Sequence, residues 1–147
     1  MNTNIEINKP SPKFQDVSIA PMHTCEHIIN QTMIRLFGCG RSVSAHIERK
    51  KSKLDYRLTA CPTEEQIKNL ENTVNQIIMQ HLPVTTEFIT QEEAKGRFDL
   101  KRLPEDASET VRVVKVGDYD ECLCIGTHVA NTCLLYTSPS PRDISGS

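Results

Sequence analysis

Two short motifs contain residue types that can bind a metal ion. His23 and His27 lie four residues apart, and in a helix such residues lie one turn apart on the same face. Apolar residues follow at about the 3.6-residue period and Gly38 supplies a stop signal, so the pattern predicts a helix beginning near Pro21. The pair can hold one transition metal ion through neutral ring nitrogens. Two histidines at this spacing also occur as ordinary surface or core residues.

The second motif lies about a hundred residues downstream and places Cys124 and His128 four residues apart. Gly126 between them allows a tight turn, so this pair does not need a helix. Zinc is bound by four nitrogen or sulfur donors in a tetrahedron, and the two motifs together supply such a set. We therefore predict one Zn²⁺ bound by His23, His27, Cys124 and His128. Cys122 is an alternative to Cys124 as the thiolate ligand.

These motifs resemble the editing domain shared by alanyl- and threonyl-tRNA synthetases. The first motif reads His-Thr-x-x-His at 23–27, and the second reads Cys-x-Gly-Thr-His-Val-x-x-Thr at 124–132. The segment 52–58 is similar to the strand between the two motifs in that family. The resemblance covers about residues 21–132 and is greatest to the free-standing alanyl-tRNA editing proteins. Family domains usually have glycine where Ile125 stands, and they continue well beyond Thr132.

The resemblance implies hydrolysis of mischarged aminoacyl-tRNA, with Ser-tRNA(Ala) as the expected substrate and the acceptor end of tRNA(Ala) as the partner. It places a pocket for the tRNA 3′ end beside the zinc ion, where Thr24 would contact a serine hydroxyl. Ser44 or His46 would point into the same pocket. We add Glu26 as a candidate base, so the candidate catalytic residues are Glu26, Thr24 and His46. Backbone N–H groups near Gly126 and Thr127 are candidates for holding the oxyanion.

The composition is that of one globular domain of 147 residues, with 37% hydrophobic and 24% charged residues. No stretch has the apolar length of a membrane span or the apolar core of a signal peptide, so we expect a cytoplasmic protein without membrane contact. Six cysteines without a secretion signal indicate reduced, mostly buried thiols rather than a disulfide framework. For assembly, the expectation is a monomer.

Charge is unevenly distributed around a net charge of −2. Residues 41–57 carry a local balance of +4, whereas residues 64–121 carry −6. A basic patch on an otherwise acidic protein is typical of a protein that binds one phosphate-bearing end of a nucleic acid. Lysines are also common on solvent-exposed hairpin turns that bind nothing. The candidate phosphate contacts are Arg49, Lys50, Lys51 and Lys53.

Alternation and capping signals predict an α+β domain with helices packed on one face of a mainly antiparallel sheet. Segments 42–47 and 52–58 are predicted to form a hairpin with its turn at 48–51. Thr63 and Gln66 predict a capping box at the start of a helix that Pro83 ends. The remaining predicted elements are a strand at 84–89, a short helix across 92–95, a strand at 110–116 and a turn at 117–118.

Three regions follow from these patterns. Residues 1–20 are expected to be an arm or edge segment, and residues 21–132 the editing-like zinc domain. Residues 133–147 are rich in serine and proline without periodicity, and they look like translated adapter or vector sequence joined to a truncated gene. A natural disordered tail is the other interpretation.

Three other functions share parts of the pattern. The order His-x-x-Glu-His in the first motif is that of inverzincin metallopeptidases, which need a further carboxylate ligand. S-ribosylhomocysteine lyase has a similar helix and a later cysteine, but it leaves His128 unexplained. A structural zinc site in an RNA-binding module is the non-enzymatic alternative.

Overall fold

A computed structural model describes residues 17–49, 51–98 and 110–137. Within these ranges the helices are η1 Val17–Ile19, α3 Ala20–Phe37, α4 Glu64–Met79, α5 Gln91–Arg97 and η3 Thr132–Thr137, where η marks a 3-10 helix. The strands are β1 Ser44–Ile47, β2 Ser52–Asp55, β3 Val84–Thr90, β4 Thr110–Val116 and β5 Asp120–Leu123.

Helix α3 carries the first motif in its opening turns. Pro21 lies within its first two positions, where a missing N–H leaves no hydrogen bond unmade. The helix ends at Gly38, whose φ of 66° lies in the left-handed region that glycine adopts without steric cost. Both predicted boundaries are confirmed, and the helix is buried along most of its length.

The capping box predicted at the start of α4 is also confirmed. Thr63 accepts from the backbone N–H of Gln66, whose side chain accepts from the Thr63 N–H in return. The helix ends at Met79, four residues before Pro83, because its last turn already closes at Gln80 with 3-10 type hydrogen bonding.

The described strands form two antiparallel sheets instead of the single sheet that the sequence predicts. β1 pairs with β2 in the expected hairpin, with Ala45 opposite Leu54. The other sheet has the order β3-β4-β5, and Gly117 in its tight turn has a φ of 51°. This positive φ favours glycine, and a Cβ at this position would also lie only 3.1 Å from the Leu82 side chain.

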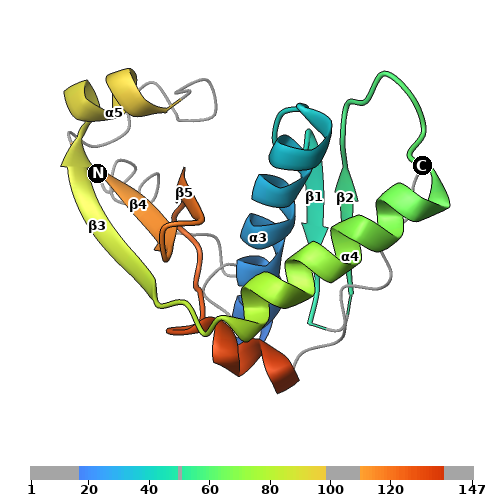
Figure 1. The fold of residues 1–147 in the computed structure, drawn as a ribbon. Coiled ribbons are helices and arrows are strands. Elements are labelled where there is room, and N and C mark those ends of the chain that lie inside the picture. The colour runs from blue at the N-terminus through green and yellow to red at the C-terminus, as the bar shows by residue number, and fades with distance from the viewer. Residues whose placement is uncertain (1–16, 50, 99–109, 138–147) are drawn as a thin grey trace.

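Helix α3 lies between the two sheets and contacts β2 on one side and β5 on the other (Figure 1). Because α3 separates the strands, they cannot join into one sheet. Helix α4 crosses α3, and their contact forms the main hydrophobic core with Ile28, Leu70 and Val74 at its centre. The α+β class is confirmed, with the correction that α3 is sandwiched rather than laid on one face.

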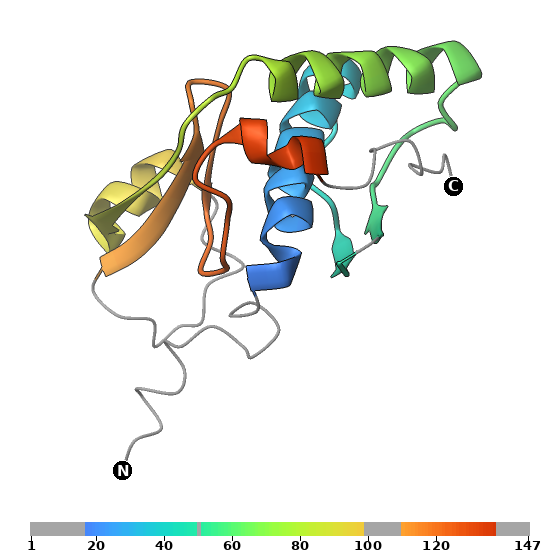
Figure 2. The same ribbon diagram turned by 90° about the horizontal axis from the view of Figure 1, so that it is seen from below.

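Helix η3 packs against both α3 and α4, as the turned view shows (Figure 2). Leu135 is buried in the main core, so the packed chain continues past Thr132, where we placed the end of the domain. Residues 1–16 of the expected arm and residues 138–147 of the expected tail lie outside the described residues. No helix in the described part of the chain combines the length and apolar character needed to cross a bilayer.

Candidate metal centre

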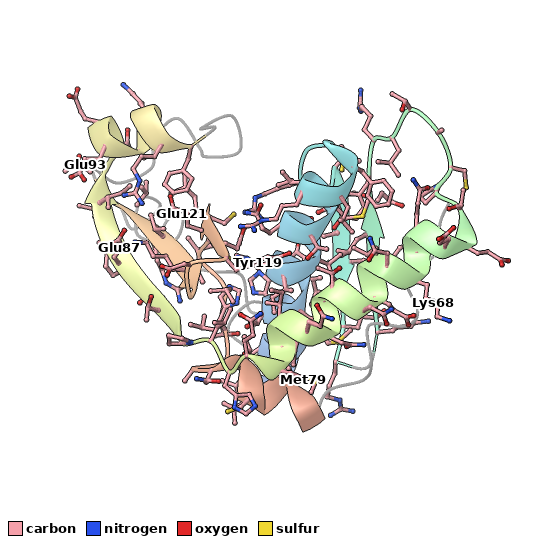
Figure 3. The ribbon with its side chains drawn as sticks, viewed as in Figure 1. Lys68, Met79, Glu87, Glu93, Tyr119 and Glu121 are labelled. Carbon is pink, nitrogen blue, oxygen red and sulfur yellow. The ribbon has the colours of Figure 1, made fainter. Side chains whose placement is uncertain are left out.

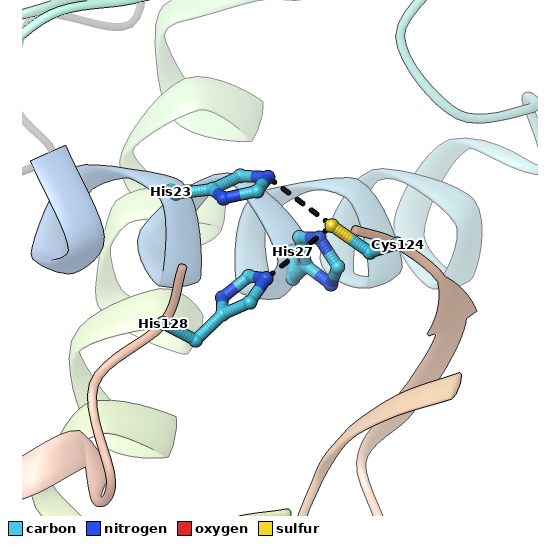
Figure 4. Close-up of side chains that lie close together, drawn as sticks. All are labelled: His23, His27, Cys124 and His128. Atoms are coloured by element: carbon cyan, nitrogen blue, oxygen red, sulfur yellow. Dashed lines mark hydrogen bonds between the residues drawn. The ribbon is translucent and has the colours of Figure 1, made fainter. Parts of the chain in front are cut away.

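The structure brings the two motifs together into one cluster. His23 and His27 project from α3, Cys124 follows the end of β5, and His128 lies on the loop beyond it (Figure 4). One potential ligand atom from each of the four residues lies within 4.8 Å of all the others. Cys122, the alternative thiolate, is not part of this cluster.

The spacing of the donor atoms suits a tetrahedral ion. Cys124 Sγ lies 3.4 Å from His23 Nε2 and 3.4 Å from His128 Nε2. Ligands at zinc bond lengths are about 3.3 to 3.8 Å apart in a tetrahedron. Three imidazoles and one thiolate are also a donor set that zinc accepts, so the residues present fit this ion.

Two of the imidazoles are held by hydrogen bonds on the side away from the cluster. His23 Nδ1 lies 3.1 Å from the carbonyl oxygen of Thr127, which can only accept, so Nδ1 carries the proton. His128 Nδ1 lies 2.9 Å from Thr24 Oγ1. A proton on Nδ1 leaves the Nε2 lone pair directed at the cluster, as metal binding requires.

Arg112 on β4 fixes the loop that follows Cys124. Its Nη1 donates to the carbonyl of Gly126 at 2.6 Å, and its own carbonyl accepts from the Cys124 N–H at 3.1 Å. The Gly126 N–H in turn donates to Cys124 Sγ at 3.5 Å. We predicted that this N–H could hold an oxyanion, but in the structure it donates to the Cys124 sulfur instead.

The electrostatics of the cluster favour the metal-binding forms of two ligands. Burial disfavours the Cys124 thiolate, but hydrogen bonds from His128, His23 and His27 outweigh this and lower its pKa to about 3. Burial, together with repulsion from His27 and His23, lowers the pKa of His128 to about 4. By contrast, burial raises the pKa of the Cys122 thiol to about 12. These opposite pKa shifts favour Cys124 over Cys122 as the thiolate.

His27 differs from the other two histidines because it faces a buried carboxylate. Its Nδ1 lies 3.6 Å from Asp120 Oδ2. Burial disfavours the charged imidazole, yet the Asp120 carboxylate and Cys124 outweigh it and raise the pKa of His27 to about 9. Asp120 is buried as well, but its contacts with His27 and Arg41 lower the pKa of its carboxyl group.

A pocket of about 190 Å³ opens beside the cluster, and polar groups contribute much of its lining. Glu26 lies in it with its Oε1 3.6 Å from His23 Nε2, and Asn30 Nδ2 donates to its Oε2 over a long 3.5 Å. Asn30 is itself fixed, because its Oδ1 accepts from the Tyr56 hydroxyl at 2.7 Å and from the Ser42 N–H at 3.0 Å. The lining residues are His23, Glu26, His27, Asn30, Arg41, Ala45, Ile47, Cys122, Leu123 and Cys124.

The hairpin residues that line this pocket differ from those predicted. Successive side chains of a strand point to opposite faces, and Ala45 and Ile47 are the ones that line the pocket. Ser44 and His46 alternate with them and are exposed. Ser44 donates to the Asp55 carboxylate, and His46 lies 3.5 Å from Glu48. The prediction that Ser44 or His46 points into the pocket is therefore wrong.

Thr24 also has a different position from the one expected. It is fully buried and does not line the pocket. Its hydroxyl accepts from the Val129 N–H at 3.1 Å and meets His128 on its other side. These contacts make Thr24 a positioning residue for His128, not a contact for a substrate hydroxyl.

Of the candidate phosphate-binding residues, Arg49 and Lys51 lie at the tip of the hairpin, and Lys53 lies on β2. Arg49, Lys51 and Lys53 are exposed, and Lys53 pairs with His46 on the face of the hairpin turned away from the pocket. Lys50 lies outside the described residues. The side chains of Arg49, Lys51 and Lys53 are thus available to an external anion.

Comparison with known proteins relates this sequence to a tRNA synthetase domain. A family model described as threonyl and alanyl tRNA synthetase second additional domain matches residues 111–135, which include the second motif. The alanine–tRNA ligase of Fervidobacterium nodosum is 30% identical over 133 residues, which is 90% of this chain. The resemblance to the alanyl-tRNA synthetase editing domain is confirmed.

Other relatives match a similar portion of this synthetase-like domain. The alanine–tRNA ligase of Pseudothermotoga lettingae is 32% identical over 79% of the chain, and that of Ligilactobacillus salivarius is 32% identical over 75%. The match covers only 15%, 14% and 13% of the length of the three ligases. The domain therefore corresponds to a small part of each relative.

The sequence analysis missed three polar residues that complete the site: Asn30, Arg41 and Asp120. Two of them follow a periodicity that the sequence contains. Asn30 lies one helical turn after Glu26, and Asp120 alternates with Cys122 along one face of β5, which ends directly before Cys124. For Arg41, which comes from the segment after α3, no pattern in the sequence gives its position.

Proposed function

We propose that this domain binds one zinc ion and hydrolyses the ester of mischarged aminoacyl-tRNA, with Ser-tRNA(Ala) as its substrate. The observation that carries the proposal is the convergence of His23, His27, Cys124 and His128 beside a polar pocket. The similarity of the chain to alanine–tRNA ligases, and of residues 111–135 to a synthetase domain, supports tRNA as the partner. We extend the proposal to a monomer and to a location in the cytoplasm, and the free state of all six cysteines supports the location.

The reaction breaks the bond between the amino acid carbonyl carbon and a ribose oxygen at the tRNA 3′ end. A water molecule supplies the new oxygen on carbon, and the ribose leaves as a hydroxyl group. A bound zinc ion would supply Lewis acid polarisation next to the ester. Glu26 would accept the proton of the attacking water and return it to the leaving oxygen, and its position in the pocket beside His23 supports this role.

The pocket lining gives a reason for preferring serine to alanine. Asn30, Arg41 and Glu26 surround the space with hydrogen-bonding groups, and Arg41 Nη1 is buried without a partner among the described residues. A serine hydroxyl can satisfy such groups, whereas the methyl group of alanine leaves them unpaired. Sites built to bind a hydroxyl discriminate strongly against the analogue that lacks it.

The deciding experiment compares the release of amino acid from Ser-tRNA(Ala) and from Ala-tRNA(Ala). We expect faster release of serine, loss of the activity on metal removal, and a fall of about 10²-fold or more for Glu26→Gln. Glu48→Gln is the matched control, since Glu48 is an exposed carboxylate on the hairpin and lies outside the pocket. Deacylation at the wild-type rate by folded, metal-free protein would show that the metal has no catalytic part.

A closed set of four protein ligands favours a second candidate, a structural zinc site in an RNA-binding module. Catalytic zinc sites usually keep one position open, whereas structural sites do not. This candidate predicts tRNA binding without ester hydrolysis. The position of His128 among the four clustered ligands argues against the lyase alternative, which gives this residue no role.

A further inference from the structure

A buried nitrogen of His27, one of the four clustered residues, faces a buried oxygen of Asp120, and neither atom has another partner among the described residues. The two atoms, His27 Nδ1 and Asp120 Oδ2, are 3.6 Å apart. The gap is less than about 1 Å longer than an N–H···O hydrogen bond. Because unpaired buried polar groups are costly, this pair is poised to form one bond.

The rest of Asp120 is arranged so that Oδ2 is left for His27. Its side chain is fully buried, and its Oδ1 accepts from Arg41 Nη2 and from Gln31 Nε2, the latter at 2.9 Å. Arg41 also donates to the carbonyl of Glu121 at 3.2 Å. Tyr119, which directly precedes β5, contacts Thr32 and Arg35 of α3 (Figure 3). Asp120 thus joins the helix that carries His27 to the strand that leads to Cys124.

We propose that Asp120 is a positioning residue that accepts the proton of His27 Nδ1 and thereby directs His27 Nε2 to the metal ion. The inference rests on the zinc site of the proposed function and not on deacylation. Each histidine of the cluster then has its own outer acceptor. His23 has the Thr127 carbonyl, His128 has the Thr24 hydroxyl, and His27 has a carboxylate.

A carboxylate acceptor has a specific consequence for the metal. It fixes the tautomer, orients the ring and makes the imidazole a stronger donor than a neutral acceptor does. Arg41 balances the charge of Asp120, so the carboxylate can stay ionised while buried. Loss of such a partner typically weakens metal binding by about 10- to 100-fold.

The test measures the zinc dissociation constant by competition with a chromophoric chelator at constant pH. We expect about 10-fold weaker binding for Asp120→Asn, whose amide can still accept, and about 100-fold weaker binding for Asp120→Leu. Gln31→Ala is the matched control, because it removes another hydrogen bond of Asp120 without touching His27. Its zinc affinity should stay within about twofold of wild type. Wild-type affinity in Asp120→Leu would overturn the proposal.

A second measurement uses the wild-type protein and therefore does not require any variant to fold. In the zinc-loaded wild-type protein, long-range nitrogen–proton NMR reports which ring nitrogen of His27 binds the metal. We expect metal-bound Nε2 and a protonated, strongly deshielded Nδ1. Metal bound through Nδ1 would overturn the inference. A protein that binds zinc in this way but does not deacylate tRNA would refute the proposed activity and leave the role of Asp120 in place.

Discussion

Thr24 Oγ1 lies 2.9 Å from Nδ1 of His128, a residue 104 positions later in the chain. The same oxygen accepts the backbone N–H of Val129 at 3.1 Å. One buried hydroxyl therefore attaches the loop of the second motif to the helix of the first. The order His-Thr in the first motif has a structural reason, because the threonine next to His23 supports His128.

Thr24→Val should weaken zinc binding and lower stability together. Valine has a similar shape but leaves the Val129 N–H and His128 Nδ1 unpaired, which costs about 1–3 kcal/mol in the free energy of unfolding. Thr24→Ser keeps the hydroxyl and should retain most of both properties. Chemical denaturation and chelator competition measure the two effects. If Thr24→Val instead changes only the preference for serine over alanine, Thr24 contacts substrate and this assignment is wrong.

Zinc should protect one cysteine of the second motif from alkylation. In metal-free protein at pH 7, Cys124 should react with iodoacetamide as a thiolate, because its pKa is lowered to about 3. Cys122 should stay unmodified, because burial raises the pKa of its thiol to about 12. Exposed Cys61 serves as an internal control that reacts with and without metal. Peptide mass spectrometry reads out each site, and protection of Cys122 rather than Cys124 would contradict the ligand assignment.

Zinc affinity should rise with pH up to about pH 9. The neutral imidazole is the binding form, and the contact with Asp120 raises the pKa of His27 to about 9. Below that pH a proton on His27 competes with the ion, so affinity should fall by about tenfold per pH unit as the pH is lowered from 8 to 6. The pH at which zinc affinity begins to fall is thus higher than for a histidine with an ordinary pKa. Chelator competition across this range provides the measurement, and a flat profile between pH 7 and 9 would contradict it.

Much of the fold could be predicted from local sequence signals. The capping box at Thr63, the stop at Gly38 and the hairpin between 42 and 58 depend on interactions within a few residues, and sequence patterns record such interactions directly. The convergence of the four residues of the His/Cys cluster was also predictable. Their chemistry is distinctive, and zinc requires four donors of this kind.

The errors came from relationships that span the chain. Nothing local to β1 tells which of its two faces meets the pocket, so Ser44 and His46 were placed on the wrong one. Whether the strands form one sheet or two depends on where α3 packs, and tertiary contacts rather than local sequence determine this position. The partner of Asp120 lies on α3, 93 positions earlier at His27, and no spacing rule links the two.

Binding of tRNA should depend on salt through the hairpin tip. Replacing Arg49, Lys51 and Lys53 with alanine should weaken binding at low salt and reduce the dependence of log affinity on log salt by about 2 to 3. Lys68→Ala is the control, because Lys68 is an exposed cation on α4 (Figure 3). Filter binding over a range of salt concentrations measures both slopes. An unchanged slope in the triple variant would place the tRNA elsewhere on the surface.

The segment 132–137 offers a test of where the packed domain ends. Leu135 is buried in the main core with Ile28 and Val74, whereas its neighbour Leu134 is 49% exposed. Leu135→Ala should lower the free energy of unfolding by about 2–5 kcal/mol, because it removes buried methyl groups and leaves a cavity between α3 and α4. Leu134→Ala is the control with the same chemistry and should change stability by less than about 0.5 kcal/mol. Chemical denaturation of the metal-free variants measures both. Equal effects of the two substitutions would show that the segment does not contribute to the core.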